Sequence, residues 1–170
     1  MNLNKSLIVG LLFIPALAFG LPEDRQQPIN IRSDTADIDN KKGISIYRGD
    51  VIITQGTTRI TGDTVTVFTK GQEVTKVTAQ GKKKRAYYEE LQPNAQGTIQ
   101  AWGYMIHYNL NNEEIELIND ALLALQGDTF KGEKINYDLA KQTVNAKGLQ
   151  SQGDDGRVQM IIQPKHTTTE

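Results

Sequence analysis

Two pairs of carboxylates have a spacing that could support acid–base chemistry. Asp37 and Asp39, and likewise Glu114 and Glu116, stand two residues apart. On a β-strand this spacing places both side chains of a pair on one face, about 6.5 Å apart, a separation that glycoside hydrolases use. The residue inside each pair is an isoleucine, which we expect to face inward, so that the carboxylates point to water. We therefore favour a solvated outer face over a catalytic site.

Other side chains that could act in catalysis or hold a metal ion are isolated. The chain has two histidines and no cysteine, whereas a metal site needs several His, Cys or carboxylate ligands. Nothing near His107 completes such a set, so we interpret it as a polar strand residue. A phosphate-binding G-x-x-x-x-G-K-[ST] loop and a G-x-S-x-G nucleophile motif are also missing. We expect a protein that is not an enzyme and that uses no metal and no cofactor.

One basic run could contact anionic groups. It reads GKKKRAYY, four positive charges followed by two tyrosines. Such a run is usually a solvated loop or a protection of a sheet edge against aggregation. The functional alternative is contact with phosphate groups of a ligand, made by Lys82, Lys83, Lys84 and Arg85.

The N-terminus has the layout of a secretory signal peptide. A single lysine precedes an apolar run at 7–14, followed by Pro15 and small residues at 16–18. We expect residues 1–18 to be cleaved, with Gly20 as the alternative end, because a membrane-spanning helix needs about 20 apolar residues. A retained membrane anchor is the alternative interpretation.

The rest of the chain is predicted to be one exported domain at 21–164 with a flexible tail at 165–170. The absence of cysteine means that the domain must be held by its core and hydrogen bonds, which suits a periplasmic protein. The formal net charge of −1 argues against a general electrostatic attraction to nucleic acid.

Apolar side chains recur at every second residue along most of this domain. Val65 and Val67 alternate with threonines, and Ile106 and Tyr108 face the side opposite His107. Glycines separate these segments at short intervals, which is typical of an all-β sandwich or barrel. The segment 112–126 differs because its apolar spacing also fits an amphipathic helix.

One strand pattern occurs twice in the sequence, seventy residues apart. The stretch 51–62 aligns without gaps with 121–132, and the string VTAQG recurs as VNAKG with three residues lost between. The repeat favours a strand over a helix in the ambiguous segment. It predicts two related strand sets, at 29–85 and 99–163, that stack to bury a common interior.

Both ends of the domain carry short alternating segments next to a proline. Terminal strands lie naturally at sheet edges, where their unpaired backbone groups can accept a strand of another chain. An open head and an open tail permit a head-to-tail filament. The predicted edge residues are Ile29, Asn30, Ile31 and Arg32 at one end, and Val158, Gln159, Met160, Ile161 and Ile162 at the other.

A long stretch of the sequence resembles a known family. The string INIRSDTADIDNKKGISIYRGDVIITQGTTRITGDTVTV, with the later GEKINYD and the C-terminal MIIQPK, is similar to the OstA-like (LptA) family of periplasmic lipopolysaccharide-transport proteins. The resemblance covers nearly all of the domain. The fold is shared by LptC, which is anchored in the inner membrane, and by the N-terminal domain of the outer-membrane protein LptD. The single domain and the cleavable N-terminus favour the periplasmic branch.

The resemblance implies a single antiparallel β-jellyroll, open like a taco shell, with a hydrophobic groove between its inner faces. In this interpretation the acyl chains of lipopolysaccharide slide along the groove while the sugars stay in water. Copies of the protein would stack head to tail and bridge the two membranes. The implied partners are lipopolysaccharide through its lipid A acyl chains, further copies of the chain, and LptC-like and LptD-like jellyroll domains.

The resemblance also suggests lipid-contacting positions. Four residues match such positions of the family: Ile29, Ile31, Tyr88 and Leu110. Alternation alone adds six apolar residues that either line the groove or only fill the core, namely Val65, Val67, Ile106, Tyr108, Ile135 and Tyr137. Family members often carry Gly-Lys-Pro-Ala where this chain has the longer basic run, so the loop before Tyr87 is expected to be longer here.

Two other functions stay open at this point. A structural module that docks or polymerises without touching lipid would have closed, fully packed inner faces. A carbohydrate-active enzyme would have a carboxylate pair of raised pKa in a cleft, and substitution of Asp37 or Glu114 would abolish its activity.

Overall fold

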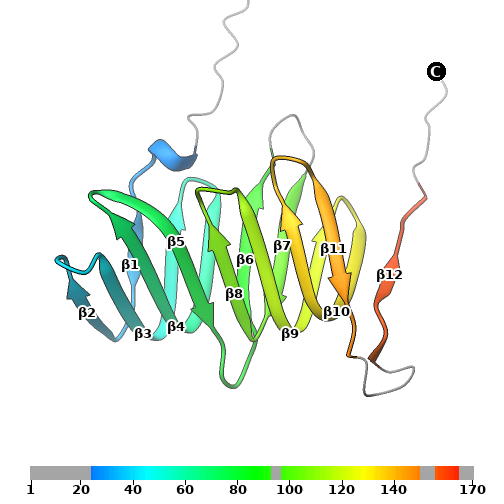
Figure 1. Cartoon of the computed structure of the whole chain (residues 1–170), viewed down its shortest axis with the longest axis horizontal. Helices are drawn as coiled ribbons and strands as arrows, with labels where there is room; N and C mark the ends of the chain where they lie inside the picture. Colours follow the sequence, from blue (N-terminus) through cyan, green and yellow to red (C-terminus); the bar gives the residue numbers. More distant parts are fainter. Residues whose placement is uncertain (1–23, 93–96, 150–155, 165–170) are drawn as a thin grey trace, which may run out of the picture.

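The structure, a computed structural model, describes residues 24–92, 97–149 and 156–164. The predicted signal peptide and the predicted tail lie outside these residues. The elements are η1 (Asp24–Gln26), β1 (Asn30–Arg32), β2 (Thr35–Asp39), β3 (Ile44–Gln55), β4 (Thr58–Lys70), β5 (Glu73–Gln80), β6 (Ala86–Leu91), β7 (Thr98–Gly103), β8 (Met105–Asn109), β9 (Glu114–Leu125), β10 (Asp128–Asp138), β11 (Thr143–Lys147) and β12 (Gln159–Ile161) (Figure 1). All strands belong to one sheet, which confirms the prediction of an all-β fold. Among the described residues, none forms a helix with the length and apolarity to cross a bilayer.

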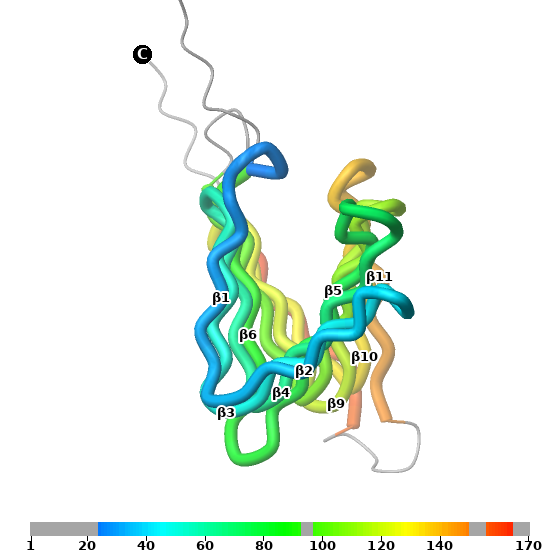
Figure 2. Tube along the Cα trace, turned by 90° about the vertical axis from the view of Figure 1, so that its left-hand side faces the viewer, coloured from blue at the N-terminus to red at the C-terminus, as the bar shows by residue number. Residues whose placement is uncertain are grey.

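Four long strands fold this sheet onto itself. These strands are β3, β4, β9 and β10. On one side of each strand, one half pairs with one neighbour and the other half pairs with a different neighbour. β4, for example, pairs with β6 through its first half and with β5 through its second half. Figure 2 shows the result, a trough with two walls that meet at a floor. Wall A has the order β1, β3, β4, β6, β7, β9, β10, β12, and wall B has the order β2, β3, β4, β5, β8, β9, β10, β11. The hairpin turns opposite the floor form two rims, which border the mouth of the trough.

The repeated motif marks the places where the long strands bend. Asp50 in β3 and Asp120 in β9 both have a positive φ, 39° and 52°. A register shift between Gly132 and Lys134 interrupts the pairing of β10 with β9. Such bulges bend a strand and increase its twist. The duplicated glycines and acidic residues are therefore the corners at which each long strand passes from one wall to the other.

The structure confirms the internal repeat. β2 and β8, and also β3 and β9, begin and end seventy residues apart, and the ambiguous segment forms strand β9. Val67 pairs with Val77, while its counterpart Tyr137 pairs with Val144. The second hairpin is thus three residues shorter. The sequence predicts this difference, because VNAKG follows VTAQG by 67 residues and not by 70.

The apolar core lies between the walls, because alternate residues of every long strand point into the trough. Val65, Ile115, Leu117, Leu123 and Ile135 have 0% exposure. Each such side chain gains about 1.5–3 kcal/mol from burial. The sheet therefore stays folded because its two inner faces cover one another.

Two glycines with the same backbone conformation should respond differently to substitution. Gly43 and Gly71 have φ of 66° and 65°, but a Cβ on Gly43 would lie 2.3 Å from the carbonyl oxygen of Thr69, while nothing lies within 4 Å of one on Gly71. We expect Gly71→Ala to cost about 1–2 kcal/mol for the left-handed conformation, and Gly43→Ala about 2–5 kcal/mol because overpacking adds to it. Urea unfolding of both variants measures the difference. Equal losses would contradict the close approach at Gly43.

Candidate functional site: an apolar groove between two walls

The structure brings most of the predicted inward-facing residues into one cluster. Seven of them are buried there, with exposures of 0–7%: Val65, Val67, Tyr88, Ile106, Tyr108, Ile135 and Tyr137. Ile31 and Leu110 are partly buried and pack against this cluster. Ile29 precedes β1 and is 42% exposed. Because the seven buried side chains present little or no surface to solvent, a ligand in the groove would reach them only if the walls part.

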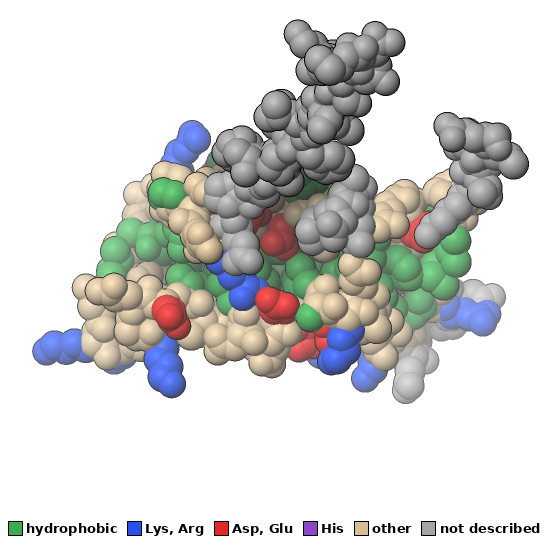
Figure 3. Space-filling model, turned by 90° about the horizontal axis from the view of Figure 1, so that it is seen from above, with side chains coloured by type: hydrophobic (Ala, Val, Ile, Leu, Met, Phe, Trp, Pro, Cys, Tyr) green, Lys and Arg blue, Asp and Glu red, His purple; other side chains and the backbone are tan. Residues whose placement is uncertain are grey.

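Seven further apolar side chains, which the sequence analysis did not assign to the groove, also pack against the core. They are partly buried hydrophobic side chains that pack on the core from the rims and from the two open ends of the trough: Tyr47, Val74, Leu125, Phe130, Leu139, Val144 and Ala146. Figure 3, a view into the mouth, shows hydrophobic side chains between rims of polar and charged ones. The repeat contained a signal for Phe130, which corresponds to the buried Ile60 seventy residues earlier.

A cleft of about 230 Å³ opens between the walls near the C-terminal end. Phe130 from wall A and Tyr137 and Val144 from wall B supply apolar lining, while Gln126 and Gln142 supply polar groups. Gln92, Thr98 and Asp128 complete its polar lining, so the cleft is more polar than a typical site for an apolar ligand. Its apolar side, made by Phe130, Tyr137 and Val144, could contact part of an apolar chain.

The N-terminal end of the groove is uncovered. Ile38 in β2 lies beside Ser45, and Ser45 lies beside the buried Val67, so that all three point to the inner face. Ile38 is nevertheless 59% exposed. The apolar inner surface thus continues to the last strand of wall B without a cover.

Polar side chains cross the middle of the groove. The Tyr88 hydroxyl donates a hydrogen bond to Glu90 on wall A, and the Tyr88 ring contacts the Tyr108 ring of wall B with centroids 5.2 Å apart. Burial raises the pKa of Tyr88 well above its usual value and also raises the pKa of the Glu90 carboxyl. Arg25 in η1 forms an ion pair of 2.8 Å with Glu113, which lies in the β8–β9 turn.

The basic run lies on the floor, on the side opposite the mouth. Lys84 pairs with Asp50 and Arg85 with Asp120, each at 3.5 Å, so two of its charges neutralise the acidic residues at the bends. The backbone N–H of Lys82 donates to the carboxylate of Asp63. A lipid in the mouth would hold its polar groups away from this loop, and we therefore do not propose the phosphate contact for these residues.

The carboxylate pairs lie on outer faces, as predicted. The Asp37 side chain is 71% exposed and pairs with Arg48. Glu116 pairs with Lys134 on the outer face of wall B, while Ile115 between the two glutamates is buried. Among the described residues, no group of three or more potential ligands could hold a metal ion.

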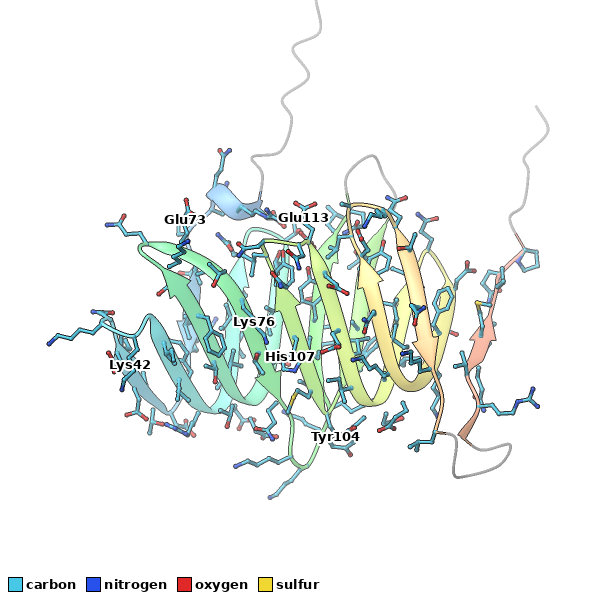
Figure 4. The ribbon with its side chains drawn as sticks, in the orientation of Figure 1. Lys42, Glu73, Lys76, Tyr104, His107 and Glu113 are labelled. Atoms are coloured by element: carbon cyan, nitrogen blue, oxygen red, sulfur yellow. The ribbon has the colours of Figure 1, made fainter. Side chains whose placement is uncertain are left out.

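His107 should make the stability of the domain depend on pH. It lies on the outer face of wall B near Lys76 (Figure 4), and its Nδ1 is 3.0 Å from the Thr78 hydroxyl oxygen. Burial, with a smaller effect of Lys76, lowers the pKa of His107. The unfolded chain, in which a histidine titrates near about 6.5, therefore binds this proton more readily than the folded chain, and stability falls as the pH drops through that value.

We expect the melting temperature to fall between pH 7.5 and pH 5.5 more in the wild type than in His107→Gln. Circular dichroism melts of both proteins measure this, and the difference between their slopes isolates the contribution of His107. Parallel slopes would show that the imidazole titrates alike in the folded and unfolded chain.

The fold and the groove define an all-β protein with a buried apolar interior between two walls, a cleft near its C-terminal end and an uncovered apolar surface at its N-terminal end. Comparison with known proteins gives the family. Residues 30–143 match the family described as "LptA/(LptD N-terminal domain) LPS transport protein". The chain belongs to this family of lipopolysaccharide transport proteins.

The named relatives agree with this assignment. The lipopolysaccharide export system protein LptH of Pseudomonas aeruginosa is 42% identical over 154 residues, covering 88% of this chain and 87% of the relative. LptA of Escherichia coli (strain K12) is 32% identical over 146 residues, covering 86% and 78%. The crystal structure of LptH, described as the LptA-homologous periplasmic component of the lipopolysaccharide transport device, superposes with a TM-score of 0.71 at 41% identity, covering 84% of this chain and all of that one.

Proposed function

We propose that this chain is a periplasmic carrier that binds lipopolysaccharide by sheltering its acyl chains in the groove. The folded sheet would then serve as an open antiparallel β-jellyroll, exported through cleavage of the signal peptide at 1–18. The observation that carries the proposal is the apolar inner surface, which follows the mouth and continues uncovered to the N-terminal end at Ile38. A closed structural module would bury this surface completely.

The energetics require such a surface. Each methylene kept from water is worth about 0.8 kcal/mol, so an acyl chain with about ten buried methylenes gains on the order of 8 kcal/mol. Free diffusion of a lipid with several such chains through water is therefore negligible. A carrier must keep the chains covered along the whole path, which makes the ends of the groove as important as its middle.

The strand directions support head-to-tail assembly. Every neighbouring pair within each wall is antiparallel. As a result, the last strand of each wall runs opposite to the first, β12 to β1 and β11 to β2. A second copy placed behind the first would thus continue both walls with antiparallel pairing. The predicted edges at 29–32 and 158–162 belong to wall A alone.

Wall B adds a pair of edges that the sequence analysis did not name. These edges are β2, which carries Asp37 already paired with Arg48 of its own chain, and β11, which ends at Lys147. In the proposed filament the groove of one copy opens into the next. LptC-like and LptD-like domains would continue it at the inner and the outer membrane.

The dependence of affinity on acyl-chain length tests the proposal. Fatty acids of increasing length, measured by calorimetry against the purified protein, should bind about fourfold more tightly per added methylene until the groove is filled. The matched control is the set of short-chain acids with the same carboxylate. An affinity that does not depend on chain length would assign binding to the head group and remove the support for an acyl groove.

A further inference from the structure

Five side chains form a polar crossing that joins the two walls midway along the groove. From wall A, Glu90 accepts the hydrogen bond of Tyr88, whose ring meets Tyr108 of wall B. Burial raises the pKa of Tyr108, and the nearby charge of Arg25 opposes part of that rise. Arg25 then reaches Glu113 at the rim of wall B. No other described ion pair joins the two rims across the mouth.

Arg25 belongs to an element fixed on the opposite rim. Asp24 accepts a hydrogen bond of 3.0 Å from the backbone N–H of Thr57 in the β3–β4 turn. The Gln55 amide donates to the carbonyl oxygens of Arg25 and Gln27, both at 3.1 Å. η1 is therefore attached to the rim of wall A by its backbone and by Asp24, while the Arg25 side chain extends from it across the mouth.

Glu113 is also anchored on its own side. Its carbonyl oxygen accepts a hydrogen bond of 2.8 Å from the backbone N–H of Leu139 in the neighbouring β10–β11 turn. Each partner of the ion pair thus moves with its wall. The distance between the two side chains reports the width of the mouth.

The local charge depends on Arg25. Burial is the main cause of the raised pKa of Glu90. The nearby charges of Asp24 and Glu113 raise this pKa further, while the charge of Arg25 lowers it. Arg25 supplies the positive charge among these carboxylates. Without it, wall A and wall B would present acidic side chains to each other and repel.

We propose that Arg25 is a positioning residue for lipid passage, which holds the mouth of the groove narrow through Glu113 until an acyl chain displaces it. This inference rests on the proposed function, because it assigns the step by which a chain enters the middle of the groove. A half-exposed ion pair changes an equilibrium by about fivefold at most. The pair therefore sets the fraction of open protein and does not seal the groove permanently.

Spin labels on the two rims test the inference without any lipid. The chain has no cysteine, so Leu91→Cys on wall A and Asn111→Cys on wall B can be labelled alone, and pulsed electron resonance gives their distance distribution. We expect Arg25→Ala to move the distribution to longer distances, and the charge exchange Arg25→Glu with Glu113→Arg to restore it. Arg48→Ala is the matched control, because Arg48 is as exposed as Arg25 and also pairs with a carboxylate.

The same variants should differ in the rate at which they take up a long-chain fluorescent fatty acid. We expect Arg25→Ala to bind about two- to fivefold faster than the wild type, and the charge exchange to return to the wild-type rate. An unchanged distance distribution in Arg25→Ala would overturn the inference even if lipid binds. If the distances change as expected but no variant binds the fatty acid, Arg25 does hold the two rims together, and the proposed function is wrong.

Discussion

Replacing Leu110 with aspartate should weaken binding of a long acyl chain by about a hundredfold or more, with the fold retained. Leu110 follows β8 at the rim of wall B and packs on the core while still partly exposed. The substitution removes apolar contact worth about 1.5–3 kcal/mol and places a charge where the bound chain would exclude water. Calorimetry with a long-chain fatty acid measures the loss, and circular dichroism checks the fold.

The neighbouring residue supplies a matched control. Asn109 points outward from wall B, and its side-chain oxygen accepts hydrogen bonds from the backbone N–H groups of Asn111 and Asn112. Asn109→Asp keeps these bonds and adds the same charge outside the groove. We expect it to bind as the wild type does, so equal affinities of both variants in folded protein would move the lipid site away from the groove.

Removing β12 should strongly weaken head-to-tail association. β12 pairs with β10 through only three residue pairs, and Val158, Met160, Ile161 and Ile162 are 42–65% exposed. Without it, wall A would end on β10, which runs in the same direction as β1, so a second copy could continue the wall only by parallel pairing. Loss of the exposed apolar contacts should weaken association by about a hundredfold or more.

Analytical ultracentrifugation over a range of concentrations measures this effect. The test variant ends at residue 156, and the control variant ends at residue 164, which removes the tail and keeps β12. We expect the control to associate like the full chain and the test variant to stay monomeric. Association of the test variant at wild-type strength would place the contact elsewhere, for instance on wall B alone.

The sequence predicted the strands well because their determinants are local or repeated. Alternation placed Ile106 and Tyr108 inside and His107 outside, and the seventy-residue repeat identified β9 as a strand against its helical spacing. The bends themselves were visible as Gly-acid motifs, but their role was not, because it depends on which half of a strand pairs with which neighbour.

The features that the sequence did not predict depend on contacts between distant segments. The sequence analysis left open whether the basic run is a solvated loop or a phosphate contact, and it did not predict that Lys84 and Arg85 pair with Asp50 and Asp120, which are 34 and 35 residues away in sequence. Arg25 precedes the first predicted strand set, which begins at 29, and pairs with Glu113, 88 residues later. Composition and spacing hold no signal for such pairs.

Site-specific photocrosslinking in cells tests the central claim most directly. A photoreactive residue at Ile31 or Leu110 would lie on the inner face, and one at Asp37, whose side chain is 71% exposed on the outer face of β2, serves as the control. We predict lipopolysaccharide adducts at the two inner positions and none at Asp37. Adducts to protein alone, or lipid adducts equally at all three positions, would contradict an acyl-sheltering groove.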